Sequence, residues 1–149
     1  MSNEVVIRQA TIDDWNSLAA LIAQMNFDHS QKFDPINSIH LVGEGILHGI
    51  RTNEAVYVAE LDNKMVGYCA WVHLPLSPEG LVNGYGTYVD EAHRGKKISE
   101  KLRASATKHC KLLGYDTIQG VAHLDNDAGL QSSLRNGFEI KGHLLQKAI

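Results

Sequence analysis

The chain of 149 residues lacks the features that mark membrane, secreted or disordered proteins. No apolar run approaches the roughly 20 residues that a membrane-spanning helix needs. The start, MSNEVVIRQAT, has neither the basic residues nor the apolar block of a signal peptide. There is no repeat, no low-complexity tract and no linker-like stretch that would separate domains. We therefore expect a single globular domain over residues 1–149, with no membrane segment.

Cysteine is scarce and the charge is close to balanced. The two cysteines, Cys69 and Cys110, fall in a strand-like run and a helix-like run, without paired spacing. This usage indicates a reducing compartment, so we expect a cytoplasmic protein with buried, reduced thiols. The net charge of −3 gives no general attraction to nucleic acid or to an anionic membrane. Any binding of phosphate must therefore be local.

The first half of the chain alternates strand and helix patterns. Residues 4–11 are rich in β-branched side chains and predict a strand. Thr11 and Asp14 form a capping box that begins a helix over residues 13–24. NFDHSQKF is expected to be a loop, and a second helix begins at Asp34 and Pro35, weakened by three glycines at 43, 45 and 49. AVYVAEL and KMVGYCAWVHL then predict a hairpin with its turn at DNK.

The second half predicts a short strand at YGTYVD after the loop PLSPEGLVNG, then a helix from about Ile98 to a cap at Gly114. A strand at YDTIQGVAHL, a short helix at NDAGLQSSLRNGF and a last strand at FEIKGHLLQKA follow. The order is β-α-α-β-β-β-α-β-α-β. It predicts an α+β fold with a mixed, mostly antiparallel sheet of about six strands flanked by about four helices.

The stretch HRGKKISEKL, residues 93–102, is the clearest candidate for binding chemistry. The first turn of the helix that begins near Ile98 has unpaired backbone N–H groups and the positive end of the helix dipole, which favour an anion. Gly95 lets an anion approach the backbone closely. The segment also supplies three cationic side chains, at Arg94, Lys96 and Lys97. These residues alone fit either a local phosphate site or a solvated charged turn, and they lack the P-loop spacing.

Two motifs together give the chain a resemblance to the GNAT N-acetyltransferase superfamily. YVDEAHRGKKISEKL resembles the acetyl-CoA loop V-x-P-x-x-[QR]-x-x-G-x-[GA], with Val89 and Arg94 on their expected places. NDAGLQSSLRNGF resembles N-x-x-[AG]-x-x-x-Y-x-x-x-G-F, matched at Asn126, Gly129, Gly137 and Phe138. The order of elements agrees with that fold over nearly the whole chain. The resemblance implies an acetyl-CoA-dependent N-acetyltransferase that acts on a primary amine of a small molecule or peptide.

The resemblance also implies the residues that bind the cosubstrate. The loop and the helix start would hold the diphosphate of coenzyme A, and the strand before the loop would supply a backbone donor for the thioester oxyanion, from Tyr88 or Val89. The implied cosubstrate-binding residues are Tyr88, Val89, Arg94, Gly95, Lys96, Lys97, Ile98, Ser99 and Asn126.

Four positions depart from the family pattern. Lys97 replaces the first loop glycine, Ser99 replaces a glycine or alanine, and Glu91 replaces a proline. Lys97 is tolerable at its position if its backbone stays near helical dihedrals and its side chain points outward, and its ammonium could also approach the anion as a point charge. Ser133 stands where many members carry the tyrosine that protonates the leaving thiolate, so this departure concerns the chemistry more than the binding.

The acid and base of the transfer remain open between several groups. Glu79, His73 and Asp90 are the candidates for the base that deprotonates the amine. The leaving thiolate takes its proton from Tyr85, from Ser133 through water, or from solvent. Of these groups, Tyr85, Glu79 and Ser133 form our set of catalytic candidates.

Two other interpretations, a binding protein without transfer activity and a metal site, have less support in the sequence. The departures at Lys97 and Ser133 leave the alternative of a GNAT-fold protein that binds acyl-CoA as a sensor or partner module, with weak or no transfer. His40, Glu44 and His48 share one helix face, but no third histidine or cysteine is near, so we expect a solvated face and no metal. The resemblance implies that the segments NFDHSQKFD and PLSPEGLVNG select the acceptor, in which Asp28, Asp34 and Glu79 could hold a cation and Phe27 and Phe33 could pack on its apolar stem. A homodimer is expected by analogy with the family.

Overall fold

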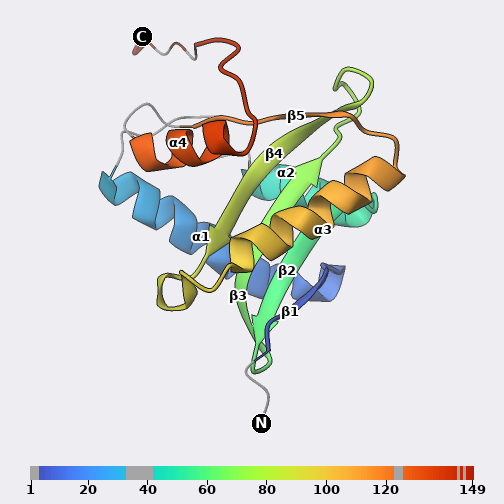
Figure 1. Ribbon diagram of the computed structural model, residues 1–149, viewed down its shortest axis with the longest axis vertical. Coiled ribbons are helices and arrows are strands. Elements are labelled where there is room, and N and C mark those ends of the chain that lie inside the picture. Colours follow the sequence, from blue (N-terminus) through green and yellow to red (C-terminus); the bar gives the residue numbers. More distant parts are fainter. Residues whose placement is uncertain (1–3, 33–41, 123–125, 144, 146) are drawn as a thin grey trace.

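The computed structural model describes residues 4–32, 42–122, 126–143, 145 and 147–149. Its centre is a five-stranded sheet in the order β1-β2-β3-β4-β5 (Figure 1). The strands are β1 (Val6–Gln9), β2 (Ala55–Leu61), β3 (Lys64–Val72), β4 (Leu81–Val89) and β5 (Thr117–Gln119). Neighbours from β1 to β4 are antiparallel, and β5 pairs with β4 in parallel. The α+β class and the mixed, mostly antiparallel sheet are confirmed.

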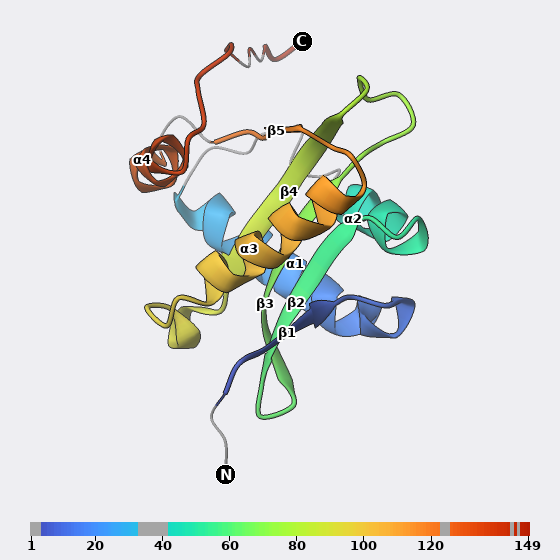
Figure 2. The ribbon, with the colours of Figure 1, turned by 45° about the vertical axis from the view of Figure 1, so that its right-hand side comes forward.

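Helices cover both faces of this sheet. They are α1 (Trp15–Lys32), α2 (Val42–Arg51), α3 (Ile98–Leu112) and α4 (Asp127–Arg135), with 3-10 turns η1 (Ile12–Asp14) and η3 (Glu91–His93). α1 and α2 pack on one face and α3 crosses the other (Figures 1 and 2). Leu18 and Ile46 are fully buried against the first face, and Leu102 and Ala106 against the second. The sheet therefore separates two apolar layers.

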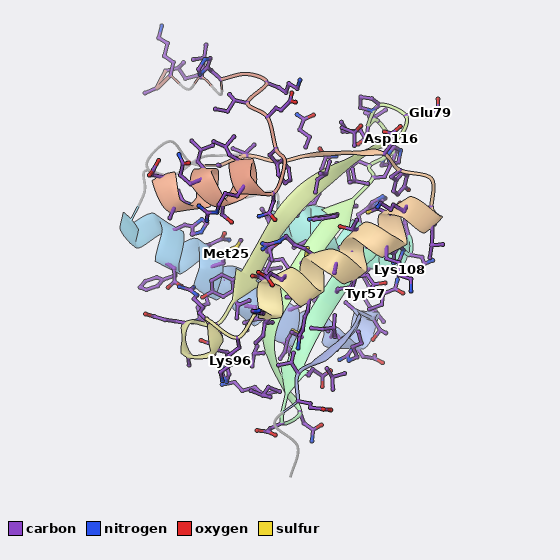
Figure 3. All side chains as sticks on the ribbon, in the orientation of Figure 1. Met25, Tyr57, Glu79, Lys96, Lys108 and Asp116 are labelled. Atoms are coloured by element: carbon purple, nitrogen blue, oxygen red, sulfur yellow. The ribbon has the colours of Figure 1, made fainter. Side chains whose placement is uncertain are left out.

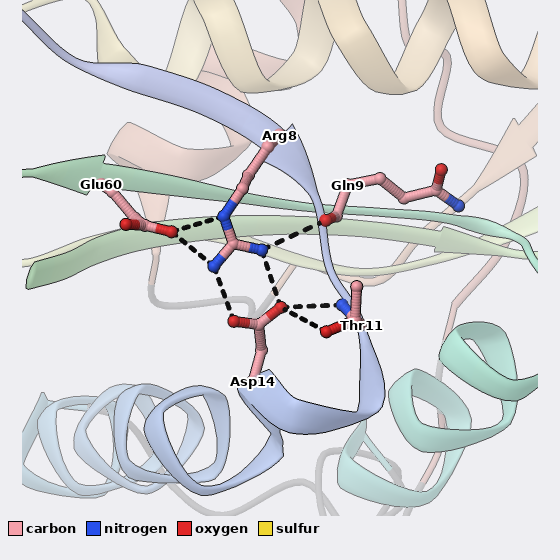
Figure 4. A network of polar contacts seen from close by, with 5 residues as sticks. All are labelled: Arg8, Gln9, Thr11, Asp14 and Glu60. Carbon is pink, nitrogen blue, oxygen red and sulfur yellow. Dashed lines mark hydrogen bonds and ion pairs between the residues drawn. The ribbon is translucent and has the colours of Figure 1, made fainter. Parts of the chain in front are cut away.

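A polar network ties the start of the chain to the sheet (Figure 4). The Arg8 guanidinium on β1 donates to both carboxylate oxygens of Asp14, at 2.7 and 2.8 Å, and also contacts Glu60 on β2. Asp14 Oδ2 accepts the backbone N–H of Thr11 at 2.7 Å, which is the reach-back bond of the expected capping box. The network thus fixes the point where β1 turns into η1 and α1.

Glycines in α2 let this helix lie close to the sheet. A Cβ added at Gly45 would come within 2.5 Å of Cζ in the Tyr85 ring, and one at Gly49 within 2.6 Å of Val72 Cγ2. The helix keeps these glycines because side chains there would push it off the sheet. The cost in helix propensity, which the sequence predicts, is offset by this contact.

Several element boundaries differ from those predicted. α1 continues through NFDHSQK to Lys32, so the expected loop there is wrong; nothing in that stretch is a proline or glycine that would stop the helix. β4 begins at Leu81 rather than at Tyr85, and β5 is limited to three residues. The expected last strand is also wrong, since the described residues after Gly137 form neither helix nor strand. The expected start of the second helix lies outside the described residues.

The hairpin and the ends of two helices follow their turn residues. Asp62 and Asn63 both have positive φ, 52° and 63°, as a two-residue type I′ turn requires. Gly114 after α3 and Gly137 after α4 have φ of 84° and 91°, the left-handed conformation of a C-terminal cap. The predicted positions of these turns are therefore confirmed.

Both cysteines are buried and unpaired, as expected. Across the part of the chain that the structure describes, no helix combines the length and the apolar composition needed to cross a membrane.

Candidate functional site

The site is organised by a fork between β4 and β5. β5 pairs with β4 only at Leu81, Val82 and Asn83. Beyond Asn83, no pairing with β5 is present in the described chain, so the rest of β4, to Val89, has a free edge. The closed end of the fork is the end where β4 and β5 are paired. There, Tyr115 donates its hydroxyl to Glu54 at 2.8 Å, and its ring stacks on His73 with centroids 5.0 Å apart.

The backbone of Val89 faces the open side of this fork. Asp90 donates its N–H to the Val66 carbonyl at 2.8 Å, which makes Val66 and Asp90 a hydrogen-bonded pair. Hydrogen-bonded and non-bonded pairs alternate along antiparallel strands, so the next pair, Gly67 and Val89, is non-bonded. The N–H and C=O of Val89 therefore point away from β3. Of the two predicted oxyanion donors, this direction favours Val89, because the same alternation turns the Tyr88 N–H toward β3.

Between β4 and α3, the chain makes two left-handed turns. Gly95 has φ of 80°, and an added Cβ there would meet nothing within 4 Å. Lys97, the N-cap residue of α3, has φ of 60° and ψ of 22°. Lys97 thus has the exposed side chain, but not the right-handed helical backbone, under which a lysine would be tolerated in this loop. A glycine, which stands at this position in the pattern that the chain resembles, would adopt this conformation without the strain that a side chain brings.

The start of α3 offers unpaired backbone donors. Lys97 has no side-chain oxygen and provides no cap bond to the first turn. In the described chain, the N–H groups of residues 95–100 have no backbone or side-chain acceptor. Ile98 is buried and anchors the helix start in the core, while Lys96 and Lys97 are exposed beside it (Figure 3 shows Lys96). This arrangement fits an anion with several oxygens, such as a diphosphate.

Arg94 holds the loop in place through its contacts, in addition to supplying positive charge. Its Nε donates to the Val89 carbonyl at 2.9 Å, and its guanidinium carbon lies 5.5 Å from the centroid of the Tyr88 ring. The Tyr88 hydroxyl in turn donates to Asp28 on α1 at 2.8 Å. Burial, followed by this bond, raises the pKa of Tyr88 to about 12. Arg94 therefore holds the loop against the end of β4, and its terminal nitrogens remain available for an anion.

Tyr85, one of the catalytic candidates, lies in the middle of β4 where the fork opens. Its ring rests on Gly45 of α2. Within the described residues its hydroxyl has no hydrogen-bond partner. Burial raises the pKa of Tyr85, so the hydroxyl keeps its proton over a wide pH range. A free, protonated hydroxyl at this place has the properties of a proton donor.

The other acid and base candidates do not converge on Tyr85. Glu79 is exposed in the loop before β4, at the opposite end of this strand from Lys96 (Figure 3). His73 is committed at the closed end, since its Nδ1 lies 2.6 Å from the Leu81 carbonyl oxygen. Ser133 is on α4 and half-buried, and within the described residues its side chain has no hydrogen bond. The structure therefore leaves the roles of Glu79 and Ser133 as predictions.

Asn126 begins α4. Its Oδ1 accepts the N–H of Gly129 at 3.0 Å, and a Cβ at Gly129 would lie 2.4 Å from Asn126 Nδ2. The N-x-x-[AG] spacing of the motif is thus explained by a helix cap that needs a small residue three positions later. Figures 1 and 2 both show α4 on the open side of β4, near the end of α1. The remaining donor of Asn126, its amide N–H₂, is free of this cap bond.

Two residues of the site, Gly86 and Tyr68, are not among those predicted from the sequence. Gly86 in β4 has φ of 102°, and an added Cβ would lie 2.8 Å from the Tyr68 hydroxyl oxygen. Tyr68 is fully buried, and its hydroxyl donates to the Tyr85 carbonyl at 3.1 Å. A glycine inside a strand pattern indicates a bulge, and a tyrosine in a buried strand indicates a polar partner for its hydroxyl. The roles of both residues could therefore have been predicted from the sequence.

The metal expectation is tested only in part. His40 lies outside the described residues, and elsewhere in the described chain no group of three or more histidine, cysteine or acidic side chains comes together.

Comparisons with known proteins match this chain to acetyltransferases. The family model described as "Acetyltransferase (GNAT) domain" matches residues 52–140. A GNAT-family acetyltransferase from Staphylococcus aureus Mu50 is similar in structure, with a TM-score of 0.73, 20% identity, and coverage of 93% of this chain and 87% of that chain. PaiA N-acetyltransferase from Thermoplasma acidophilum, solved with coenzyme A, has a TM-score of 0.72, 19% identity, and coverage of 93% and 91%.

A third similar structure is AAC(6')-Iy, solved with the bisubstrate analogue CoA-S-monomethyl-acetylneamine. Its TM-score is 0.70 at 17% identity, with 98% of each chain covered. A comparison with curated proteins found no match. At these identities the structural likeness bears on the fold alone, whereas the family model covers more than half of the chain.

Proposed function

The chain belongs to the GNAT acetyltransferase family, and from that membership and the geometry of the fork we propose that it is an acetyl-CoA-dependent N-acetyltransferase. The substrate class is a primary amine on a small molecule or a peptide. The observation that carries the proposal is the continuity of two features. The free edge of β4 ends at Val89, and the loop that follows presents unpaired N–H groups at the start of α3.

Each part of this surface suits one part of acetyl-CoA. The N–H groups of residues 95–100 would hold the diphosphate, with Arg94 and Lys96 supplying positive charge beside it. The free edge of β4 would receive the extended pantetheine arm through backbone hydrogen bonds. We also assign to this surface the remaining members of the cosubstrate set: Lys97 and Ser99 in the loop and first turn, Ile98 as the buried anchor of the helix start, and Asn126 as the N-cap residue of α4.

When bound, acetyl-CoA supplies the thioester whose acetyl group passes to the amine, with a C–N bond formed and the C–S bond broken. The N–H of Val89 would donate to the carbonyl oxygen as negative charge develops on it. Tyr85 would donate its hydroxyl proton to the departing sulfur, since its raised pKa keeps it protonated. Glu79 would take the proton of the amine through water, and Ser133 would assist at sulfur only if α4 approaches β4.

The similar structures support an amine acceptor. AAC(6')-Iy is bound to an analogue that joins coenzyme A to an acetylated neamine, and another similar protein, meta-AAC0020, was solved with sisomicin. We carry over from them only the class, an amine, and not the compound. We propose further that residues 1–149 act as one domain.

The first test is binding. Acetyl-CoA should raise the melting temperature, because a ligand that binds only the folded state stabilises it. S-acetylpantetheine, which keeps the thioester but lacks the diphosphate, should bind much more weakly if the loop holds the diphosphate. Equal binding of the two compounds would contradict the assignment of the loop, and no binding of acetyl-CoA would contradict the proposed function.

The second test is turnover. Free coenzyme A should be released when acetyl-CoA is mixed with a panel of amines, for which butylamine, 1,4-diaminobutane, kanamycin and a lysine peptide serve as probes. The exposed position of Glu79 before β4, and the serine at position 133 in place of a tyrosine, favour one alternative, a GNAT-fold protein that binds acyl-CoA as a sensor or partner module. Binding without release on any amine of the panel would support that alternative.

A further inference from the structure

The extra residue in β4 decides which backbone groups face the fork. Cys69 lies opposite Thr87, and Trp71 lies opposite Gly84, so the single residue Ala70 faces both Tyr85 and Gly86. This is a β-bulge, and it shifts the pairing register by one residue. A shift by one residue exchanges the groups that point to the two sides of a strand. The bulge is therefore the reason that Val89 turns its N–H toward the open side.

The bulge is held by one buried hydroxyl. Tyr68 is fully buried on β3, and its hydroxyl donates to the carbonyl oxygen of Tyr85 inside the bulge at 3.1 Å. The same hydroxyl oxygen lies 3.3 Å from Met25 Sδ on α1. It also lies where a side chain at residue 86 would begin, since a Cβ on Gly86 would come within 2.8 Å of it.

The surroundings make this bond directional. The Tyr68 ring lies in the hydrophobic core that α1 and α2 form with the sheet, a core that also contains Tyr88. A buried hydroxyl without an acceptor is costly, and so is a buried carbonyl without a donor. The Tyr68 hydroxyl and the Tyr85 carbonyl therefore each satisfy the hydrogen-bonding need of the other. Gly86 supplies the positive φ of 102° that the bulge needs.

We propose that Tyr68 is a positioning residue for acetyl transfer, whose hydroxyl fixes the bulge at Tyr85 and Gly86 and thereby directs the Val89 N–H at the thioester carbonyl. This inference rests on the proposed function. Tyr68 does not touch the reacting atoms. It acts through the backbone of β4, so its effect belongs to the reacting carbonyl and not to the diphosphate, which is held by the loop at the other end of the cosubstrate.

The test compares Tyr68→Phe with Tyr57→Phe. Tyr57 is a matched control, because its hydroxyl bonds to His109 Nδ1 at 3.0 Å and lies on the α3 face of the same sheet (Figure 3). Each variant loses one tyrosine hydroxyl and one hydrogen bond. The readouts are the ¹³C resonance of acetyl-CoA labelled at the acetyl carbonyl and the ³¹P resonances of its diphosphate, recorded free and bound.

In Tyr68→Phe, the bound carbonyl resonance should move back toward its free value while the bound ³¹P resonances stay in place. Where an amine of the panel is acetylated, kcat should fall by about tenfold, the order expected when a reacting group is misplaced, with KM for acetyl-CoA unchanged. Tyr57→Phe should keep the wild-type resonances and kcat. A carbonyl resonance unchanged in Tyr68→Phe, or shifted equally in both variants, would overturn the inference.

A third variant separates the hydroxyl from the packing of α1. Met25→Leu removes the sulfur but leaves the bond from Tyr68 to Tyr85, so it should keep the wild-type carbonyl resonance. A shift as large as that in Tyr68→Phe would mean that the packing of α1 sets the bulge, and would also overturn the inference. If wild-type protein binds no acetyl-CoA, the proposed function itself is wrong; if it binds and Tyr68→Phe behaves like wild type, only the role of Tyr68 is wrong.

Discussion

Lys97 is a residue with a strained backbone, next to the unpaired N–H groups at the start of α3. It holds a left-handed conformation, with φ of 60°, at the start of α3, and its side chain is exposed. This conformation costs a side-chain-bearing residue roughly 1–2 kcal/mol. The loop thus keeps a strained position beside the proposed diphosphate site, where a glycine would be free of strain.

Replacing Lys97 by glycine should therefore raise the free energy of unfolding, by up to about 1 kcal/mol after the greater chain entropy of glycine in the unfolded state is subtracted. The affinity for acetyl-CoA should be retained or increased, because the backbone donors stay in place. Urea unfolding and calorimetric titration measure the two quantities. Lys96→Gly is the control, since Lys96 is also exposed but has no positive φ, and it should give no stabilisation. Clearly weaker binding in Lys97→Gly alone would instead make the Lys97 ammonium a direct contact.

At the scale of an element, α2 shows that its glycines differ in purpose. Gly45 lies against the Tyr85 ring, whereas the nearest atom to a Cβ on Gly43 is Trp15 Cη2, at 4.0 Å. Both residues cost the isolated helix the same propensity. At Gly45, but not at Gly43, close contact with Tyr85 on β4 offsets this loss of helix propensity.

Gly45→Ala should destabilise the protein by about 1–3 kcal/mol, because an added methyl group must displace a ring in a packed layer. Gly43→Ala should instead stabilise it by up to about 1 kcal/mol, through helix propensity alone. Thermal and urea unfolding of the two variants give the comparison. Similar changes in both would show that α2 does not depend on contact with Tyr85.

At the scale of the whole molecule, the stability should depend on pH through Asp14. The hydrogen bonds from Arg8, followed by the backbone N–H of Thr11, lower the pKa of Asp14 from 3.8 to about 2. A carboxyl with a lowered pKa in the folded state contributes stability above its unfolded pKa. That contribution is lost as the pH falls from about 4 toward 2.

Asp14→Asn should therefore lower the free energy of unfolding at pH 7 by about 1–2 kcal/mol, a value reduced for the partial exposure of Arg8. The difference from wild type should shrink as the pH approaches 2, where the wild-type carboxyl also becomes neutral. Asp13→Asn serves as the control, since Asp13 is exposed and has no partner within the described residues. Urea unfolding at pH 7, 4 and 2.5 gives the comparison, and a constant difference across that range would contradict the assignment.

The sequence predicted the order of elements from β1 to α4, because each element depends on a local pattern of residues, whereas the assignment of the loop before α3 to a diphosphate stays a prediction. Periodicity, the turn at Asp62 and Asn63, and the cap at Gly114 each depend on a few adjacent residues. The bulge at Gly86, the contact of Gly45 with Tyr85 and the left-handed turn at Lys97 depend on distant strands and helices. The prediction of a last strand was wrong for the same reason. Alternating apolar residues permit a strand, but a strand also needs a neighbouring strand to pair with, and β5 is too short to provide one there.

The free half of β4 has a consequence for handling the protein without ligand. A row of unpaired backbone groups at the edge of a sheet is a template for any extended chain, including a second molecule of the same protein. An occupant of the fork would cover those groups. Coenzyme A in the buffer should thus act as a guard against self-association, and the ligand-free protein should be the form that aggregates first as its concentration rises.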